Sequence, residues 1–476
     1  MNIISHFNKI LEESFNNFLK KYFYESNFWH KTASIDNYID FMTDFDNFNY
    51  SFMINVIKSY FEYIDEIFFN TSYRKNFCVS KGFYTRTILT LFGEITFKRR
   101  YYLDKNDNER FYFTDYFLNI PKRKYFDPFI CANICEEAAS YSYSKAGKIV
   151  ADRIGKKINN NIYISRASAR NVVMQFKVDN AVYPEDKKRI EKLFIMLDEK
   201  FVGSQFNDKK DHMIKAAILF EGTELVYKSK RKANSIDRYR LVNSHTCASI
   251  ENELLIDTVN YIYNTYDVDS LKEINFMGDC ALWIKKFPKS SWFRFDNNIK
   301  VNFSMDGFHF SQALNYLTTQ KYDDVYDALY EYVSDNNKND FIRLCNEFLD
   351  LFPERQEVIE SKKEYILNNW NERQFYLNHP YLKCSMESHI SHIFADLFTS
   401  RPKAYYKKGL RQLLKIRLLK VNNKDIKKMY FNNFRNKEIK VNYSSTYYNE
   451  YNNYSSEINY YNSLDIGNFD NYINFI

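Results

Sequence analysis

The sequence is poor in the residues that interrupt regular structure. It holds 10 Gly and 7 Pro among 476 residues, about 4% of the chain where an average protein has roughly 12%. That scarcity excludes collagen-like, Pro-rich and flexible-linker proteins. No stretch approaches the roughly 18 uncharged apolar residues of a membrane helix, so we expect no membrane partner.

Cysteine is also sparse, and it follows no framework. The seven Cys residues are scattered and odd in number, which argues against a set of structural disulfides. The N-terminal residues mix charges into their apolar positions, unlike the apolar centre of a signal peptide. We therefore expect a cytoplasmic protein in a reducing environment.

Aromatic residues are abundant instead. They make up 18% of the chain, with 41 Tyr and 43 Phe, which provides apolar area for sizeable cores. The length predicts two or three packed units. The excess of Asn, Lys, Ile, Tyr and Phe indicates an AT-rich coding bias, so the abundance of Lys by itself says little about function.

Positive charge is concentrated in one segment. Residues 398–440 contain 14 Lys or Arg and only two acids, Asp425 and Glu438, a net charge of +12. The whole chain has 67 basic and 60 acidic residues, so the remainder, with 53 basic and 58 acidic residues, carries −5. Such a segment suits binding to a phosphate backbone. A solvated, Lys-rich helical face would have the same composition.

Helical and strand patterns alternate in the first part of the chain. Residues 1–83 place apolar side chains three and four positions apart, which predicts amphipathic helices. Residues 84–125 alternate apolar and polar side chains around Phe92-Gly93 and around residues 105–108, which predicts a small antiparallel β-meander.

Residues 126–180 predict three short helices, the last of them beginning after Ser165 as its N-cap. Arg166, Ser168 and Arg170 lie near the start of that helix. This is typical of a helix-turn-helix, in which the last helix offers its N-terminal residues to DNA. An ordinary three-helix packing unit has the same pattern.

A different pattern begins near residue 190. The segments KLFIMLDEK, MIKAAILF and ELVYKSK read as strands at hairpin spacing, and a helix and a strand-turn-helix follow. This order predicts an α/β fold with an RNase H-like domain. Its first part covers residues 190–310, an all-helical insertion covers 311–380, and a helix with the basic segment covers 381–440. The Asn/Tyr/Ser-rich residues 441–476 predict a disordered tail.

Three acids stand where these elements could direct them into one cleft. Asp198 closes the first strand, Asp279 closes the fourth, and Glu387 lies on the helix after the insertion. Carboxylate oxygens suit Mg²⁺ or Mn²⁺, and two such ions can clamp the oxygens of a phosphoryl transfer. Each acid alone is more often a turn or cap residue; together they predict a metal site.

Glu199 directly follows Asp198. Because successive strand residues point to opposite faces, we expect one of the two to face away from the cleft. The apolar run before them favours Asp198 as the residue in the cleft.

Several blocks resemble a known family. They are LDEKFVGSQ, GDCALWIK, the run from Asp306 to His309, and MESHISH with the TSRPKAYYKKGLRQLLKIR that follows it. The chain resembles, over roughly residues 84–422, the ISLre-type insertion-sequence transposases. That family was long catalogued as an uncharacterised bacterial protein family and is similar to the Mutator-like transposases.

The resemblance implies an RNase H-like DDE catalytic domain. It assigns catalysis and metal binding, with two Mg²⁺ or Mn²⁺ ions, to Asp198, Asp279 and Glu387. Asp306 and His309 are similar to the Asp-x-x-His signature of the Mutator-like enzymes. They would support the site. Trp283, in the GDCALWIK block, would have the same supporting role.

Three positions depart from the family pattern. Phe201 stands where members commonly carry His, Cys280 replaces the usual Gly after Asp279, and Leu282 replaces a small residue. These changes leave room for a decayed or repurposed copy.

The basic segment would bind DNA phosphates directly after the catalytic helix. Its candidate residues are Arg401, Lys403, Lys407, Lys408, Arg411, Lys415 and Arg417. The expected partners are the ends of the element and its target DNA, held by a homo-oligomer. The expected activity is cleavage and strand transfer of an insertion sequence. An inactive DNA-binding remnant and a structure-specific nuclease without strand transfer remain as alternatives.

Overall fold

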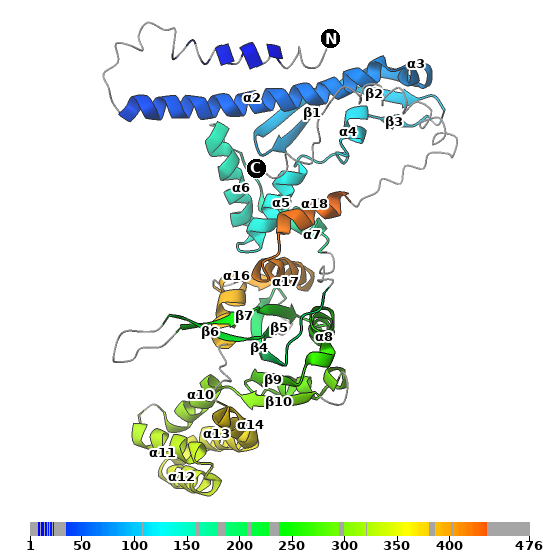
Figure 1. The fold of residues 1–476 in the computed structure, drawn as a ribbon. Coiled ribbons are helices and arrows are strands. Elements are labelled where there is room, and N and C mark those ends of the chain that lie inside the picture. Colours follow the sequence, from blue (N-terminus) through cyan, green and yellow to red (C-terminus); the bar gives the residue numbers. More distant parts are fainter. Residues whose placement is uncertain are drawn as a thin grey trace. The chain divides into compact units, whose positions relative to one another are not determined.

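The computed structural model describes residues 35–435 with short gaps, and scattered residues between 8 and 22 (Figure 1). The gaps are 107, 159–161, 179–185, 207–210, 228–237, 295–298, 320, 380–385 and 401–402. Residues up to Phe431 form one compact unit, and Asn432–Ile476 form a second. The predicted disordered tail, 441–476, lies outside the described residues.

The N-terminal part consists of helices followed by a meander, as predicted. Helices α2 (Ile35–Asn70) and α3 (Ser72–Phe77) precede an antiparallel sheet of order β1-β2-β3. Its strands are β1 (Cys78–Thr90), β2 (Gly93–Asp104) and β3 (Arg110–Phe111), and the short helix α4 (Phe113–Phe117) follows. Strand β1 begins six residues before the predicted position. Its register shifts between Ser80 and Phe83, around Gly82 at φ +103°. This bulge hides the alternation of the strand.

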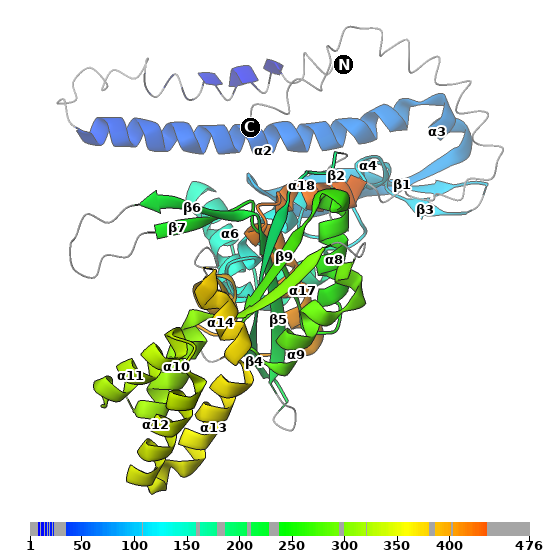
Figure 2. The ribbon, with the colours of Figure 1, turned by 60° about the horizontal axis from the view of Figure 1, so that its bottom comes forward.

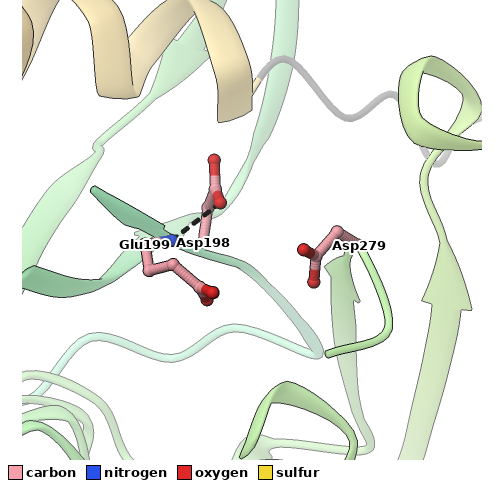
Figure 3. Close-up of side chains that lie close together, drawn as sticks. All are labelled: Asp198, Glu199 and Asp279. Carbon is pink, nitrogen blue, oxygen red and sulfur yellow. Dashed lines mark hydrogen bonds between the residues drawn. The ribbon is translucent and has the colours of Figure 1, made fainter. Parts of the chain in front are cut away.

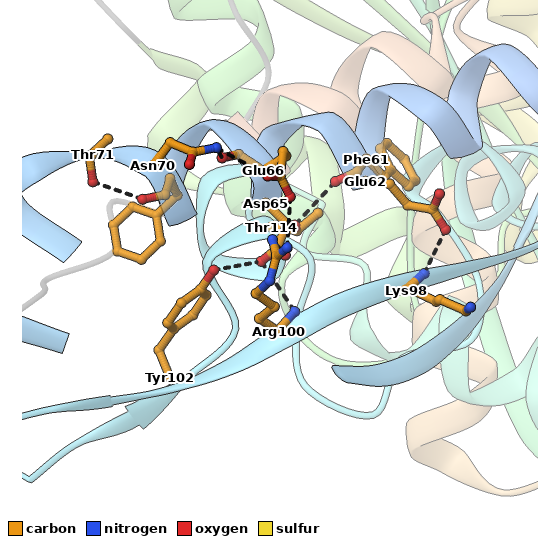
Figure 4. Close-up of polar contacts among 11 residues, drawn as sticks. Phe61, Glu62, Asp65, Glu66, Asn70, Thr71, Lys98, Arg100, Tyr102 and Thr114 are labelled. Atoms are coloured by element: carbon orange, nitrogen blue, oxygen red, sulfur yellow. Dashed lines mark hydrogen bonds and ion pairs between the residues drawn. The ribbon is translucent and has the colours of Figure 1, made fainter. Parts of the chain in front are cut away.

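Polar contacts hold α2 against β2 (Figure 4). The Asp65 carboxylate accepts from the Arg100 guanidinium at 2.9 Å and from the Tyr102 hydroxyl at 3.2 Å. Arg100 also pairs with Glu66 at 2.7 Å, and its guanidinium stacks on Phe69. Burial raises the pKa of Asp65, while the contacts from Arg100 and Tyr102 oppose that rise.

The three helices predicted for residues 126–180 are α5 (Pro128–Ala138), α6 (Tyr143–Ile158) and α7 (Arg166–Gln175). Ser165 is the N-cap of α7, and its hydroxyl accepts from the Ser168 N–H at 3.0 Å. The apolar side chains of these helices share one core cluster with the central sheet.

The central sheet is mixed. Its order is β10-β9-β4-β5-β8, in which β4, β5 and β8 are antiparallel neighbours and β9 and β10 are parallel to β4. The strands in this order are β4 (Lys192–Ser204), β5 (His212–Phe220), β8 (His245–Ser249), β9 (Glu273–Gly278) and β10 (Lys300–Met305), and a sixth short strand pairs with β4. The α/β fold class is therefore confirmed.

One strand of this sheet was predicted in the wrong place. The described part of the ELVYKSK segment, residues 224–227, lies in β6 (Gly222–Tyr227), which pairs with β7 (Arg238–Val242) in a separate two-stranded sheet. The third antiparallel strand is β8, whose sequence HTCAS is short and lacks an apolar alternation. Its residues are buried from Thr246 to Ser249, and burial of a short strand on both faces removes the alternation on which the prediction relied.

Helices cover both faces of the sheet (Figure 2). Leu193, Ile195 and Leu197 of β4 pack in a cluster with α8 (Leu254–Thr265). Phe194 and Met196 pack in a second cluster with the C-terminal helices. These are α15 (Met386–Ile390), a π-helical turn (Ser391–Ala395), α16 (Asp396–Phe398), α17 (Lys407–Val421) and α18 (Ile426–Arg435), and the short strand β11 (Ala404–Tyr405) pairs with β4.

The predicted insertion is helical throughout its described residues and has its own core. Its helices are α10 (Gly307–Thr318), α11 (Asp323–Ser334), α12 (Lys338–Leu351), α13 (Gln356–Asn368) and α14 (Trp370–Asn378). Met305 at the end of β10 belongs to this core, so the insertion packs directly against the sheet. Shorter elements are α9 (Leu282–Lys286) and the 3₁₀ turns Val268–Ser270, Phe287–Lys289, Ser291–Arg294 and Pro353–Arg355. None of the described helices combines the length and apolar character that a bilayer-spanning helix requires.

The Arg100–Asp65 contact should make stability depend on pH. We expect Arg100→Met to lower the free energy of unfolding by about 3 kcal/mol at pH 8 and by less towards pH 5. Without the guanidinium, the folded-state pKa of Asp65 rises further above its unfolded value, so stability is lost as pH rises through it. Urea unfolding at both pH values measures this.

The control is Arg240→Met, which removes an exposed pair with Glu224 and should leave the unfolding free energy nearly unchanged. A loss from Arg100→Met of the same size at both pH values would contradict the assignment.

Candidate metal centre

Two of the predicted acids meet where the pairing of two neighbouring strands ends. Asp279 directly follows β9, but the expectation that Asp198 closes the first strand was wrong, because β4 continues to Ser204 along its pairing with β5. Strands β4 and β9 are parallel, and their last paired residues are Met196 and Met277. Asp198 lies two residues beyond the first, and Asp279 lies two residues beyond the second. Because β4 and β9 run in parallel up to this point, two residues separated by 81 positions in sequence come together (Figure 3).

A glycine makes this approach possible. A Cβ atom at Gly278 would lie 2.8 Å from the backbone oxygen of Leu197 and 2.8 Å from the Ile284 side chain. The next turn brings the chain into α9: the Asp279 carboxylate accepts from the Ala281 N–H at 2.8 Å. Cys280 between them has φ +67°, a left-handed conformation in which glycine fits without strain.

Glu199 joins the two aspartates, contrary to the expectation that it or Asp198 would face away. One carboxylate oxygen from each of Asp198, Glu199 and Asp279 lies within 4.8 Å of the others. The side chains of β4 do alternate between the two faces of the sheet. Met196, two residues before Asp198, packs in one core cluster, and Leu197, two residues before Glu199, packs in the other. The longer side chain of Glu199, however, carries its carboxylate back towards Asp279 (Figure 3).

The Glu199 carboxylate is held by a tryptophan. The indole N–H of Trp283, on α9, donates to Glu199 at 2.5 Å. Lys215 is the partner of Glu199 across the β4–β5 pair, and its ammonium lies 5.2 Å from the Trp283 ring centroid. Burial raises the pKa of Glu199, as does the charge of Asp279, while Trp283, Lys215 and His309 oppose the rise. The sequence analysis left Glu199 out of the predicted metal ligands because successive strand residues point to opposite faces. Nothing in the sequence distinguished Lys215.

Asp306 and His309 form the next layer. Asp306 follows β10, and its backbone N–H donates to the backbone oxygen of Gly278 at 3.1 Å. Its carboxylate caps α10 by accepting from the His309 N–H at 2.8 Å, and contacts His309 Nδ1 at 2.7 Å. Burial lowers the pKa of His309, but that hydrogen bond and the charges of Asp306, Asp279 and Asp198 outweigh it and raise the pKa to about 9. His309 therefore brings positive charge to the acidic cluster.

Position 387 lies on α15, which packs against β4. Met386 and Ile390 of this helix are buried in the same cluster as Met196, on the sheet face of Asp198. The side chain of Glu387 lies outside the described residues, as does Arg401.

The remaining departures from the family pattern differ in exposure. Leu282 is 79% exposed and Phe201 is 53% exposed, so neither is confined by the fold. Cys280 is buried in the core of the insertion.

The basic residues of the C-terminal segment fall into two groups. Arg417 donates to the backbone oxygens of Ile393, Ala139 and His392, and Lys403 donates to that of Leu397. These two cations join parts of the fold. Lys408 and Lys415 are exposed.

Lys407 and Arg411 contact acids that precede α8. Lys407 pairs with Glu251 at 3.3 Å, and Arg411 pairs with Glu253 at 2.5 Å. Arg166 and Arg170 are exposed on α7, whereas the Ser168 hydroxyl contacts that of Ser165 at 2.9 Å. Two of the three residues predicted at the start of this helix thus face solvent.

The donor set suits a hard divalent cation. All three clustered side chains offer carboxylate oxygens, the ligands that Mg²⁺ and Mn²⁺ prefer. No described His or Cys joins them in the cluster, which disfavours zinc.

Comparison with known proteins identifies the family. The model of an uncharacterised protein family, UPF0236, matches residues 48–434, so the chain belongs to this family. Among its relatives are the UPF0236 proteins TTE0402 and TTE2489 of Caldanaerobacter subterraneus subsp. tengcongensis. Each is 24% identical over 384 residues, which cover 80% of this chain and 73% and 78% of the relatives. Another relative from that organism, also 24% identical over 80% of this chain and 77% of its own length, has a name that joins eleven TTE designations.

The approach of β9 to β4 can be tested at Gly278. We expect Gly278→Ala to cost about 1–3 kcal/mol of stability, because its Cβ meets a backbone oxygen that cannot rotate away. It should also weaken binding of Mn²⁺, because Asp279 is displaced from Asp198. Urea unfolding and a Mn²⁺ titration measure the two effects.

Gly222→Ala is the matched control, since a Cβ there meets nothing within 4 Å. Wild-type Mn²⁺ affinity in Gly278→Ala would refute the role of this contact in the cluster.

Proposed function

We propose that this member of the UPF0236 family is a DDE-type DNA transposase, which cleaves and transfers the strands of an insertion sequence. One observation carries the proposal: the carboxylates of Asp198 and Asp279 converge where the parallel pairing of β4 with β9 ends. The family resemblance of the GDCALWIK and MESHISH blocks assigns those same two residues, with Glu387, to catalysis.

The sheet supports an RNase H-like domain. Three antiparallel strands lead into a helix and two parallel strands, and the first strand lies at the centre of the sheet. The helix that carries position 387 packs against that central strand. A helical insertion between the second Asp and the Glu agrees with the architecture that the resemblance implies.

Asp198, Asp279 and Glu387 would hold Mg²⁺ or Mn²⁺, with Glu199 as a further oxygen donor. When bound, such ions activate a water or a DNA 3′-hydroxyl and stabilise negative charge on the leaving oxygen. Trp283 keeps the Glu199 carboxylate turned towards Asp279 through its indole N–H. Protonated His309, held by Asp306, offsets negative charge at the edge where a DNA phosphate would approach.

DNA binding would use the exposed cations. Arg166 and Arg170 on α7, and Lys408 and Lys415 on α17, leave their charged groups available to phosphates. Lys407 and Arg411 would first exchange their acidic partners for DNA. A homo-oligomer that pairs the two element ends, and a cytoplasmic location, belong to the same proposal.

The naming of one relative adds support. Eleven designations from one organism stand under a single name, and we take them as copies of one gene. A gene that recurs within one genome is expected of a mobile element.

Catalysis can be tested by transposition from a donor plasmid that carries the gene with its native flanking DNA. We expect Asp279→Asn to reduce transposition by at least about 10³-fold, since a carboxylate needed for metal binding is lost. Asp327→Asn, an exposed acid on α11, is the matched control and should behave as wild type.

Unchanged transposition in Asp279→Asn would refute the proposal. Cleavage of the flanking DNA without joining would favour the nuclease, and binding without cleavage in the wild-type protein would favour the inactive remnant.

The α7 arginines should contribute to DNA affinity through phosphates. We expect Arg166→Ala and Arg170→Ala each to weaken binding to the flanking DNA and to reduce the slope of log K against log salt by about 1. Gel-shift titrations at several salt concentrations measure this. Arg343→Ala on α12, where the arginine pairs with Asp340, is the control; a slope equal to wild type in both α7 variants would place DNA elsewhere.

A further inference from the structure

We propose that Tyr365 and Lys285 are positioning residues through which the helical insertion holds Asp279 in the acidic cluster. The inference rests on the proposed function, because it explains how one of the proposed metal ligands is kept in place. Neither residue belongs to the cluster itself.

The turn that carries Asp279 needs external support. It leaves β9 at Gly278, passes through Cys280 at φ +67°, and enters α9 at Leu282. A side chain with a Cβ adopts this left-handed conformation reluctantly. Such a conformation persists where surrounding contacts determine it.

Tyr365 supplies one of those contacts. It lies on α13 of the insertion, and its hydroxyl donates to the backbone oxygen of Asp279 at 2.5 Å. The Asp279 carboxylate meanwhile accepts from the Ala281 N–H. The residue is thus held on its main chain by the insertion and on its side chain by the turn, which limits how far its free oxygen can move.

Lys285 supplies a second contact one turn further along the chain. Its ammonium donates to Asn369 Oδ1 at 2.8 Å and to the Asn368 backbone oxygen at 3.2 Å, and it pairs with Glu372 at 3.1 Å. These partners lie where α13 passes into α14. Lys285 therefore ties α9 to the insertion.

The buried side of the same turn also meets the insertion. Cys280 is 7% exposed and packs in the core with Met305, Phe310 and Leu314. Trp283, which holds Glu199, lies on α9 between Cys280 and Lys285. Two of the three clustered carboxylates, Asp279 directly and Glu199 through Trp283, thus depend on contacts with the insertion.

Binding of Mn²⁺ alone to the full chain tests the inference without any DNA. Free Mn²⁺ is measured by its electron paramagnetic resonance signal during titration. We expect Tyr365→Phe and Lys285→Met each to weaken Mn²⁺ binding about tenfold, the lower end of the effect of outer contacts on metal ligands. Tyr326→Phe removes a hydroxyl from α11 of the same insertion and should leave the affinity unchanged.

Urea midpoints separate positioning from folding. A purely structural role for Tyr365 would lower the midpoint of Tyr365→Phe below that of Tyr326→Phe and leave Mn²⁺ affinity of the folded protein unchanged, which would overturn the inference. Lys285→Met provides the same test at a second contact. If Asp279→Asn abolishes Mn²⁺ binding while both positioning variants bind as wild type, the metal centre stands and the inference fails. If Asp279→Asn binds Mn²⁺ as wild type does, the proposed metal centre itself fails.

Discussion

The absence of a side chain at Gly278 is the constraint on which the acidic cluster depends. The backbone of β4 and the side chain of Ile284 occupy the space that a Cβ would need. Only this close approach allows the end of β9 to lie beside Asp198. The parallel pairing of β4 and β9 then brings together carboxylates that are far apart in sequence.

Three carboxylates at this distance repel one another, and the surrounding residues reduce the cost. Trp283 donates to Glu199, and the cations of Lys215 and His309 act on the same carboxylate. His309 in turn is held by Asp306 at the start of α10. A cation delivered to this cluster would act in the same direction, because opposite charge stabilises ionised carboxylates.

The cations of the C-terminal basic segment differ in what they contact. Arg417 donates to backbone oxygens from two places in the fold, Ala139 and the adjacent His392 and Ile393. Gln412 on the same helix donates to the end of α7. Helix α17, which belongs to the basic segment, therefore also connects the helices α5 and α7 with the central sheet. Charge density in a sequence does not distinguish a cation that binds a carbonyl inside the fold from one that faces solvent.

Local sequence determined much of this protein. Helical spacing located the insertion, Ser165 marked the start of α7, and the apolar run before Asp198 located the central strand. Only the tertiary structure decided which strand completes the sheet, because β8 is short and buried, and that Glu199 belongs with the aspartates, because the reach of a side chain can overcome the alternation of a strand. It also decided that Tyr365 contacts Asp279, since a hydrogen bond across 86 residues depends on packing between elements that no local pattern records.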